Sequence, residues 1–398
     1  MQDSINKCKR IYYINNRYPE KRCVIDKCTG YQYINMDQDG IISRVFDKII
    51  QSIGHKYSRA KGEKTLSVYT YTRRNGVIHT FNSCIKSQMP WICTFESVVP
   101  RTNCTRKRDW DKIDHLTCKA AKLLAKDNCL QCLALSEAAY KLQKDFLSSL
   151  KGRVSEGDIE KIKSKTTVLH PPQEVLITQA EIVKKFSSAN KKEFIFVGHD
   201  FFRKGGKEIV DTLKKLENEY NFHLTIISKM EYDDYASMAT KEERDEYLEF
   251  FEDCDWITYY EEMDNEQVIQ LCKNMHIGLL PTFADTYGYS VLEMQACGCT
   301  MVTTDIRALP EINNSQCGYI CHLPHDEFGE AYYYSAEQRK EMKQNLKREL
   351  EVTFKEILAA QMSQLCEKAI NSVKRIEKMH NPKLYGEYIK KYIEQKKN

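Results

Sequence analysis

Short apolar runs alternate with stretches of helical periodicity along most of the chain. In the first half, the segment 39–54 places apolar side chains at positions 41, 42, 45, 46, 49 and 50, the spacing of an amphipathic helix, and it ends at Gly54. Strands that alternate with such helices indicate parallel βα units. The strands predicted in this half are the apolar runs 66–72, 76–81, 91–95, 133–136 and 166–172.

The second half repeats this alternation more clearly. Residues 207–220 carry apolar side chains on one face of a predicted helix, and a further helix is predicted over 265–275. Beyond about residue 326 the chain is charged and predicted to be helical, without strands. The strands predicted in this half are 193–198, 223–228, 276–281 and 300–305.

A chain of 398 residues is too long for one hydrophobic core, so two domains are expected. Pro171 and Pro172, followed by the polar stretch 186–193, place the predicted boundary near residue 185. We therefore predict an N-terminal Rossmann-like domain, a C-terminal Rossmann-like domain and a helical segment that packs back on the domains, over residues 1–185, 186–330 and 331–398.

The net charge of +4 is unevenly distributed along the chain. Residues 1–190 contain 33 Lys and Arg against 19 Asp and Glu, whereas the remaining residues contain 27 against 37. This asymmetry suggests that the two domains face different partners. The densest basic patch, 101–112, fits an anionic membrane surface, where each cation would contribute on the order of 1 kcal/mol, and fits a solvated basic face equally well.

The location of the protein is predicted from what the sequence lacks. No apolar run approaches the roughly 20 residues that span a bilayer, and the charged N-terminus has no apolar core of a signal peptide. We therefore expect a cytoplasmic protein. Because of the basic patch, we also consider a peripheral position at the inner face of the membrane. No nucleic-acid partner is predicted.

Sixteen cysteines in such a chain are expected to be reduced thiols rather than a disulfide framework. The CxxC at Cys129 and Cys132, with Cys104 and Cys118 upstream, raises the alternative of a zinc site. The spacing fits no standard zinc finger, and the surrounding "CLQCLAL" has the composition of an apolar strand. Buried thiols are therefore the favoured interpretation, and no metal is predicted.

The strand-to-helix joint "FVGHDFFRKGGKEI" is the first candidate for chemistry. Its glycines allow the backbone to approach a ligand, and the helix that follows directs free N–H groups and its positive dipole end at the loop. Arg203 and Lys204 lie in this loop and would offset the charge of a diphosphate. The spacing is not that of a Walker A loop. The alternative is a common glycine-rich turn with a solvated Arg-Lys pair.

The second candidate is "PTFADTYGYSVLEMQACG", which places Asp285 and Glu293 on either side of Gly288. A structural alternative exists for both acids, because Ser290 and Glu293 fit a capping box and Asp285 fits a turn. The helix nevertheless begins at the carboxyl end of a predicted strand, where α/β folds bind ligands. The backbone N–H groups of 286–290 would then point at the ligand.

Together these two segments resemble the C-terminal domain of family 4 glycosyltransferases, which are retaining enzymes of the GT-B fold. In that family a strand leads into a G-x(5)-K-G loop, which matches Gly198 through Lys204 and Gly205. About 80 residues further on, the family has an E-x(7)-E pair in a "P…EGFG…LEAMACG" pattern, then a strand and a "PEI" turn. This chain has Pro281, "DTYGYSVLEMQACG" and "TMVTTDIRALPEI" in that order, so the resemblance covers residues 190–315.

The resemblance implies a role for each matched residue. Lys204, with Arg203 beside it, would hold the diphosphate of a nucleotide sugar, and Glu293 would hold the ribose hydroxyls. Asp285 replaces the family's first glutamate, which contacts the transferred sugar and stabilises the charge that develops on it. His199 stands where the family often has arginine, so both positions depart from the pattern. The implied donor-binding residues are Gly198, His199, Gly205, Thr286, Tyr287, Gly288, Tyr289 and Ser290.

The N-terminal half resembles the family more thinly. Gly40 falls where the family has a Gly-Gly turn that opens the first helix, so it would approach the donor or the acceptor. Glu96 falls where many members have a histidine after an x-T-F strand, and it would orient the sugar or an acceptor hydroxyl. The alternative for Glu96 is a surface carboxylate that pairs with Arg101. His79 is interpreted as a packed strand residue.

The implied fold is α/β and GT-B, with two Rossmann-like domains that face a central cleft and with C-terminal helices. The implied activity is transfer of a hexosyl group from a nucleotide-diphosphate sugar, with retention, to a glycan or lipid-linked acceptor in cell-surface polysaccharide or glycoconjugate synthesis. The family needs no bound metal, and no cofactor is expected besides the donor substrate. Two alternatives stay open: a non-catalytic GT-B subunit that binds a nucleotide sugar or a partner, and a sugar-nucleotide epimerase of the same fold.

Overall fold

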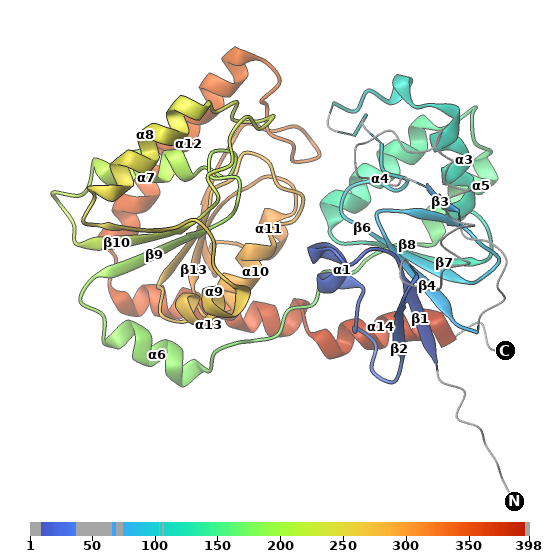
Figure 1. Cartoon of the computed structure of the whole chain (residues 1–398), viewed down its shortest axis with the longest axis horizontal. Coiled ribbons are helices and arrows are strands. Elements are labelled where there is room, and N and C mark those ends of the chain that lie inside the picture. The colour runs from blue at the N-terminus through green and yellow to red at the C-terminus, as the bar shows by residue number, and fades with distance from the viewer. Residues whose placement is uncertain (1–8, 37–65, 69–74, 103, 106, 395–398) are drawn as a thin grey trace, which may run out of the picture. The chain divides into compact units, whose positions relative to one another are not determined.

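The computed structural model describes residues 9–36, 66–68, 75–102, 104–105 and 107–394. The chain forms two compact units: Met1–Pro172 together with Pro382–Asn398, and Gln173–Asn381 (Figure 1). The helix predicted over 39–54, with Gly40, lies outside the described residues.

The first unit is built on a six-stranded sheet in which every neighbouring pair of strands is parallel. Its two central strands, β4 and β6, are buried along their whole length, as expected where helices cover both faces of a parallel sheet. In spatial order the strands are β2 (Gln32–Asn35), β1 (Arg10–Tyr13), β4 (Val77–Phe81), β6 (Trp91–Phe95), β7 (Cys129–Ala134) and β8 (Thr166–Val168). A separate two-stranded ladder joins β3 (Leu66–Val68) and β5 (Cys84–Lys86). The helices of this unit are α1 (Tyr18–Cys23), η3 (Trp110–Lys112), α3 (His115–Leu124), α4 (Glu137–Ser149), α5 (Glu156–Ser164) and α14 (Pro382–Glu394).

The last helix of the chain, α14, belongs to the core of this first unit. Tyr385, Ile389 and Ile393 from α14 are buried in one cluster with side chains of β1, β4, β6 and β7. The hydroxyl of Tyr385 donates a hydrogen bond of 2.7 Å to the carbonyl oxygen of Cys23. Gly386 allows close contact, because a Cβ there would lie 2.3 Å from the carbonyl oxygen of Lys27. The predicted C-terminal segment 331–398 is therefore divided between the units.

The second unit contains a parallel sheet in doubly wound order, with the first strand in the middle. In spatial order its strands are β11 (Ile257–Tyr260), β10 (Phe222–Ile227), β9 (Lys192–Val197), β12 (Ile277–Leu280), β13 (Thr300–Thr304) and β14 (Gly318–Cys321). The chain runs outward in opposite directions from β9 and β12, so the sheet has its topological switch point between these strands. Ligands of such sheets bind outside the carboxyl ends of the strands at the switch point.

Helices cover both faces of this sheet. Figure 1 shows α7 (Gly206–Lys214), α8 (Lys241–Glu252) and α12 (Ala336–Ala359) together on one face, and α6 (Gln179–Ser187), α9 (Asn265–Cys272), α10 (Tyr289–Ala296) and α13 (Met362–Met379) on the other. A short helix, α11 (Leu309–Ile312), follows β13. Helix α12 starts with a capping box between Ser335 and Gln338 and buries Met342, Leu346 and Leu350 at spacings of four residues. Its buried face packs against α7, so α12 is part of this unit.

The units divide at Pro172, whereas the sequence places the boundary near residue 185, within α6. The difference arises because α6 is anchored to the second unit. The ammonium group of Lys185 donates hydrogen bonds to the carbonyl oxygens of Met275, Cys297 and Gly298, at 2.8, 3.2 and 2.7 Å. The predicted boundary rests on the polar composition of 186–193, which does not reveal that a lysine binds carbonyl groups far away in the sequence.

The predicted strands correspond to β3, β4, β6, β7 and β8 in the first unit and to β9, β10, β12 and β13 in the second. The sequence did not predict β1, β2, β5, β11 and β14, which have three or four residues each. The helix predicted over 207–220 ends at Lys214, and Leu216 is nevertheless 2% exposed, because the following turns pack against the same core.

Within the part of the chain that is described, no helix is long and apolar enough to cross a membrane. The described cysteines form no disulfide, and all but two of them are buried. The Sγ atoms of Cys129 and Cys132 lie 3.9 Å apart inside the first unit. No group of three or more His, Cys, Asp or Glu side chains among the described residues is arranged to hold a metal ion.

Candidate functional site

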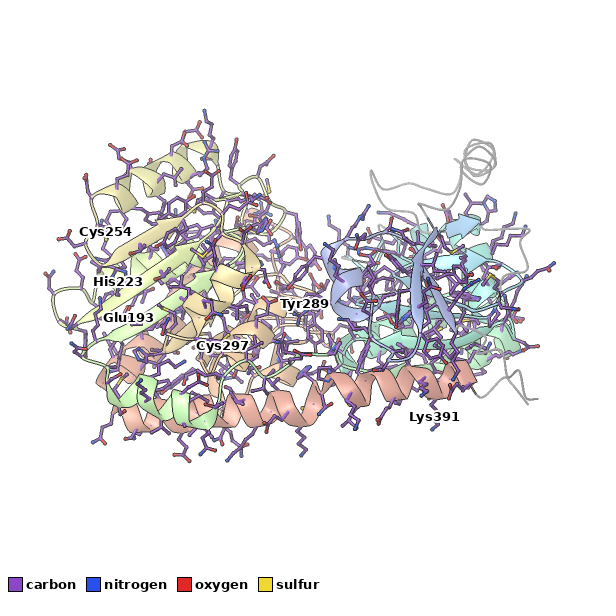
Figure 2. All side chains as sticks on the ribbon, turned by 60° about the horizontal axis from the view of Figure 1, so that its bottom comes forward. Glu193, His223, Cys254, Tyr289, Cys297 and Lys391 are labelled. Carbon is purple, nitrogen blue, oxygen red and sulfur yellow. The ribbon has the colours of Figure 1, made fainter. Side chains whose placement is uncertain are left out.

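Two loops of the second unit meet at the switch point of its sheet. One loop, residues 198–205, follows β9 and leads into α7, and the other, residues 281–288, follows β12 and leads into α10. Tyr289 begins α10 at this carboxyl edge of the sheet, whereas Glu193 and His223 lie opposite each other near the starts of β9 and β10 (Figure 2). These are the two segments that the sequence singles out as candidates for chemistry.

Lys204 is folded over the start of its own loop. A Cβ at Gly198 would lie 2.6 Å from Cδ and 2.9 Å from Nζ of Lys204, so a larger residue there would displace the Lys204 side chain from this position. The amide of Gly198 donates a hydrogen bond of 3.0 Å to the carbonyl oxygen of Ile227, which fixes the end of β9. The Lys204 side chain forms no hydrogen bond or ion pair within the described structure. Its charge is therefore available to an anion at the carboxyl end of β9.

The backbones of the two loops are joined directly. The carbonyl oxygen of Arg203 accepts a hydrogen bond of 3.0 Å from the amide of Phe283 and one of 3.2 Å from the Thr282 hydroxyl. Gly205 has a φ of +79°, and a Cβ there would lie 2.3 Å from the carbonyl oxygen of Pro281. A side chain at this position would thus strain the backbone and push the loops apart.

The guanidinium group of Arg203 ties the same two loops together. It donates hydrogen bonds to the carboxylate of Asp200 and to the carbonyl oxygen of Ala284, and its side chain is only 14% exposed. Burial by itself would lower the pKa of Arg203, but the Asp200 carboxylate and the nearby charge of Asp285 outweigh burial and raise it. Arg203 was predicted to share the diphosphate with Lys204, and the structure gives it protein partners in addition.

Asp285 lies on the second loop, half-buried, near the Arg203 charge. Its Oδ1 accepts a hydrogen bond of 3.3 Å from the amide of Tyr287, which supports the predicted turn. Thr286 is half-buried beside it, and the buried Tyr287 ring lies 5.6 Å from the Tyr289 ring. This loop places a carboxylate and a tyrosine pair at the start of α10.

The predicted capping box at the start of α10 is wrong. The N-cap residue is Gly288, with a φ of +91°, and no side chain caps the helix. Ser290 is already inside the helix, and its hydroxyl is buried without a hydrogen-bond partner among the described residues. Glu293 is 8% exposed within α10, so its position is not explained by a capping role. The N-cap position of α10 supplies no side-chain acceptor to the first N–H groups of the helix.

Of the two remaining predicted residues, His199 is exposed and Glu96 is paired within the first unit. The His199 side chain is 67% exposed, with Nδ1 3.9 Å from Oε1 of Glu231. Glu96 follows β6 in the first unit, and its Oε1 accepts hydrogen bonds of 3.1 Å from both Arg101 and Asn82. The alternative of a carboxylate paired with Arg101 is therefore what the structure contains.

The structure adds two residues that the sequence did not single out. Asp200 binds the guanidinium group of Arg203. Tyr235 belongs to the loop after β10, and the centroid of its ring lies 6.0 Å from Cζ of Arg203. Asp200 could have been noticed from its spacing of three residues before Arg203. Tyr235 carries no such signal, because only the sheet brings its loop beside the first one. His79 is a packed residue as predicted, with Nε2 2.8 Å from Oγ1 of Thr94, and burial lowers its pKa to about 3.

The two parallel six-stranded sheets and the C-terminal helices match solved structures of the GT-B fold. A sucrose-phosphate synthase from Thermosynechococcus elongatus has a TM-score of 0.58 at 13% identity, and the match covers 97% of this chain and 98% of that one. A glycosyltransferase from Rickettsia africae has a TM-score of 0.54 at 13% identity, over 98% and 100% of the two chains. HepE from Anabaena, in complex with UDP and glucose, has a TM-score of 0.54 at 11% identity, over 97% and 100%.

At these identities the structural likeness establishes the GT-B fold. Residues 178–349 match the family described as Glycosyl transferases group 1. This segment runs from the N-cap of α6 into α12 and includes both loops of the candidate site. The comparison with curated proteins gave no match. Both of these loops, which meet at the switch point of the second unit's sheet, lie within the segment that matches this family.

Proposed function

We propose that the protein is a retaining glycosyltransferase of family 4 that moves a hexosyl group from a nucleotide-diphosphate sugar. One observation carries the proposal: the ammonium group of Lys204, which has no partner among the described residues, lies over Gly198. Its loop leads into α7 and is hydrogen-bonded to the loop that leads into α10. A cation on a loop that leads into a helix N-terminus is an arrangement suited to a diphosphate. HepE, which has the same fold, was solved with UDP-glucose, which supports a nucleotide sugar as the donor.

In this proposal, charge develops at two places as the donor breaks. The leaving diphosphate gains negative charge, which Lys204 and the N–H groups at the starts of α7 and α10 stabilise. The sugar gains positive charge at its anomeric carbon, which the Asp285 carboxylate stabilises. Glu293 holds the ribose. Because cations and helix dipoles act on the leaving group, the proposed reaction does not depend on a bound metal.

The acceptor's proton goes to the departing phosphate in the proposed mechanism. No carboxylate of the first unit then has to serve as a base. This agrees with the structure, in which Glu96 already accepts hydrogen bonds from Arg101 and Asn82. The acceptor is proposed to be a glycan or a lipid-linked glycan used for cell-surface polysaccharide or glycoconjugates. Its site would be at the inner face of a membrane, in contact with the basic segment 101–112. Co-sedimentation that does not depend on anionic lipid would contradict this location.

The donor site is tested by thermal shift with UDP, GDP, ADP and CMP and with their sugar conjugates. Stabilisation by one nucleotide series is expected, and it should be lost in Lys204→Ala. Turnover of that donor should fall by on the order of 10²-fold in this variant, since a preorganised charge contact to the leaving group is lost. Lys215→Ala is the matched control, because Lys215 lies at the other end of α7 and is 61% exposed.

A non-catalytic nucleotide-sugar-binding subunit is the second candidate. The observation that favours it is that Glu96 and Arg203 both have protein partners, so fewer charged groups face a substrate than the resemblance implies. The two functions differ in a simple measurement. The binding subunit would be favoured if one nucleotide stabilises the protein but the donor is neither hydrolysed, nor transferred, nor converted to another sugar. Interconversion of the donor sugar without an acceptor would favour an epimerase.

A further inference from the structure

A second concave site lies in the same unit, between the loop after β10 and the first three turns of α12. It is a pocket of about 350 Å³, within the size range of small-molecule sites. None of its lining residues belongs to the loops 198–205 and 281–288. Four of the seven lining side chains are cations and none is acidic: Ser237, Ala336, Arg339, Lys340, Lys343, Gln344 and Lys347.

Two of these cations donate hydrogen bonds to backbone carbonyl groups rather than to carboxylates. Arg339 donates a hydrogen bond of 2.9 Å to the carbonyl oxygen of Tyr333, and Lys343 donates one of 2.8 Å to the carbonyl oxygen of Ser237. A carbonyl oxygen orients an ammonium or guanidinium group but does not cancel its charge. The Lys340 side chain forms no hydrogen bond or ion pair within the described structure.

The spacing of these cations along α12 is unfavourable for the helix itself. Arg339, Lys343 and Lys347 follow one another at intervals of four residues, and like charges at this spacing destabilise a helix by about 0.2–0.5 kcal/mol per pair. Farther along the same helix, Lys355 is paired with Glu351 at 2.9 Å in the ordinary i, i+4 manner. In the pocket only Lys347 has a carboxylate partner, Asp211 of α7, at 2.6 Å. A bound anion would relieve the repulsion.

A buried carboxylate beneath the pocket does not fully offset this charge. Glu208 of α7 is 1% exposed, and neither of its carboxylate oxygens has a hydrogen-bond partner among the described residues. Lys343 and Lys347 of α12 and Lys207 of α7 are cations that act on it. Burial raises the pKa of Glu208 to about 7, so a large fraction of this group is protonated at neutral pH.

We propose that this pocket binds the phosphate group of a ligand other than the sugar donor, as a phosphomonoester or a diphosphate. Three cations of one helix face, Arg339, Lys340 and Lys343, have no ion-pair partner among the described residues. They match a compact anion of more than one charge better than a single carboxylate. The same chemistry is present in a soluble phosphorylated compound and in a lipid headgroup. The site would therefore add a phosphorylated ligand to the proposed transferase without depending on the donor site.

The site is tested on the full chain by calorimetric titration with inorganic pyrophosphate, in a Lys204→Ala background that disables the donor loop. Binding is expected to persist in that background and to weaken by roughly tenfold for each cation removed in Lys340→Gln and Lys343→Gln, since each loses a charge-assisted hydrogen bond. Arg348→Gln and Lys355→Gln are the matched controls, because they remove charge from α12 outside the pocket. Glu208→Gln at pH 8 should tighten binding, a gain that a misfolded variant would not show.

The two sources of the phosphate are distinguished by a second probe. Vesicles with phosphatidic acid are compared with vesicles of equal charge that contain phosphatidylserine. Preference for phosphatidic acid that is lost in Lys340→Gln and Lys343→Gln would identify a headgroup, whereas binding of pyrophosphate alone would identify a soluble ligand. The proposal is overturned if neither probe binds, if the control variants lose as much affinity as the pocket variants, or if Lys204→Ala alone abolishes binding.

Discussion

At the scale of single residues, Lys204 and Arg203 are neighbours in the sequence with different surroundings. Lys204 has no protein partner within the described structure and lies over Gly198. Arg203 is buried between the carboxylate of Asp200 and the carbonyl oxygen of Ala284. We therefore expect Lys204 to act on the leaving group and Arg203 to act through the loops whose positions it fixes.

Arg203→Lys separates these two tasks, because lysine keeps the charge but loses the planar fork that reaches two partners. The free energy of unfolding is expected to fall by about 1–3 kcal/mol, since the groups that Arg203 satisfies lose a donor. kcat is expected to fall as well. Asp200→Asn should cause a smaller loss of both stability and kcat. Urea denaturation and steady-state kinetics measure the two quantities. Unchanged stability with a large rise in KM would instead indicate direct contact between Arg203 and the donor.

Glu208 gives the second unit a pH dependence of stability. Burial raises its folded-state pKa from 4.5 to about 7. The charged groups that act on it include Lys207 and Asp211 of α7 and Lys343 and Lys347 of α12. The folded state then binds more protons than the unfolded state between these values, so this group's contribution makes the protein less stable as pH rises through that window.

The variant Glu208→Gln removes this titration and is compared with wild type at pH 5 and pH 8. Its stability advantage over wild type is expected to grow between these values by on the order of 2–3 kcal/mol. Other titrating groups, such as the buried His276 with a pKa lowered to about 4, are present in both proteins and cancel in the difference. A difference that is constant with pH would show that Glu208 is ionised in the folded state throughout.

At the scale of elements, the candidate site is made by the starts of two helices that begin at glycines with positive φ. Gly205 precedes α7 and Gly288 precedes α10, each in a conformation that other residues adopt at a cost. Neither residue has a side chain that could cap its helix, so the N-cap position supplies no side-chain acceptor to the first N–H groups. The same glycines let the loops approach each other.

Gly205→Ala tests whether this approach is needed for donor binding. Gly152 has the same φ of +79° but has nothing within 4 Å of an added Cβ, so Gly152→Ala reports the backbone strain alone. That strain is expected to cost about 1–2 kcal/mol. Gly205→Ala should cost more, because its Cβ meets the carbonyl oxygen of Pro281, and it alone should abolish nucleotide-induced stabilisation. Equal effects of the two substitutions would refute the role of the close contact.

At the scale of the whole molecule, the chain ends in the unit where it began. Helices α12 and α13 complete the second unit, and α14 fills the core of the first. The apolar face of α14 is supplied by Tyr385, Ile389 and Ile393, at spacings of four residues. The first unit's folding therefore requires residues that are more than 200 positions away from the rest of it.

Ile389→Ala tests this dependence. The side chain is fully buried, so its loss should destabilise the first unit by about 2–5 kcal/mol. Leu384→Ala on the same helix is the control, because Leu384 is 58% exposed and should change stability by about 0.5 kcal/mol or less. Hydrogen exchange should show faster exchange in β1, β4 and β6, with α7 and α10 unchanged. Equal loss of protection in both units would contradict the division.

The strands and helices that the sequence predicted are those with long apolar runs or clear periodicity. β4, β6, β12 and β13 are buried along their whole length, as parallel strands covered on both faces are, so they could be recognised without neighbours. β1, β2, β11 and β14 are four residues long and partly polar, so only their pairing partners define them. The boundary predicted near residue 185 also depends on distant partners. Lys185 donates hydrogen bonds to carbonyl groups 90 and 113 positions away, which attach α6 to the second unit.

By itself the sequence determined the α/β class, because apolar periodicity is a local property. From glycine positions and charge, which are also local, it predicted two domains and two segments proposed to hold a diphosphate. Only the tertiary structure decided that these segments touch, that Arg203 joins them, that Gly288 rather than Ser290 caps α10, and that Glu96 is paired with Arg101. It also decided that four cations of α12 line one pocket beside Ser237. Each of these depends on side chains and carbonyl groups brought together across the fold, which a linear pattern does not record.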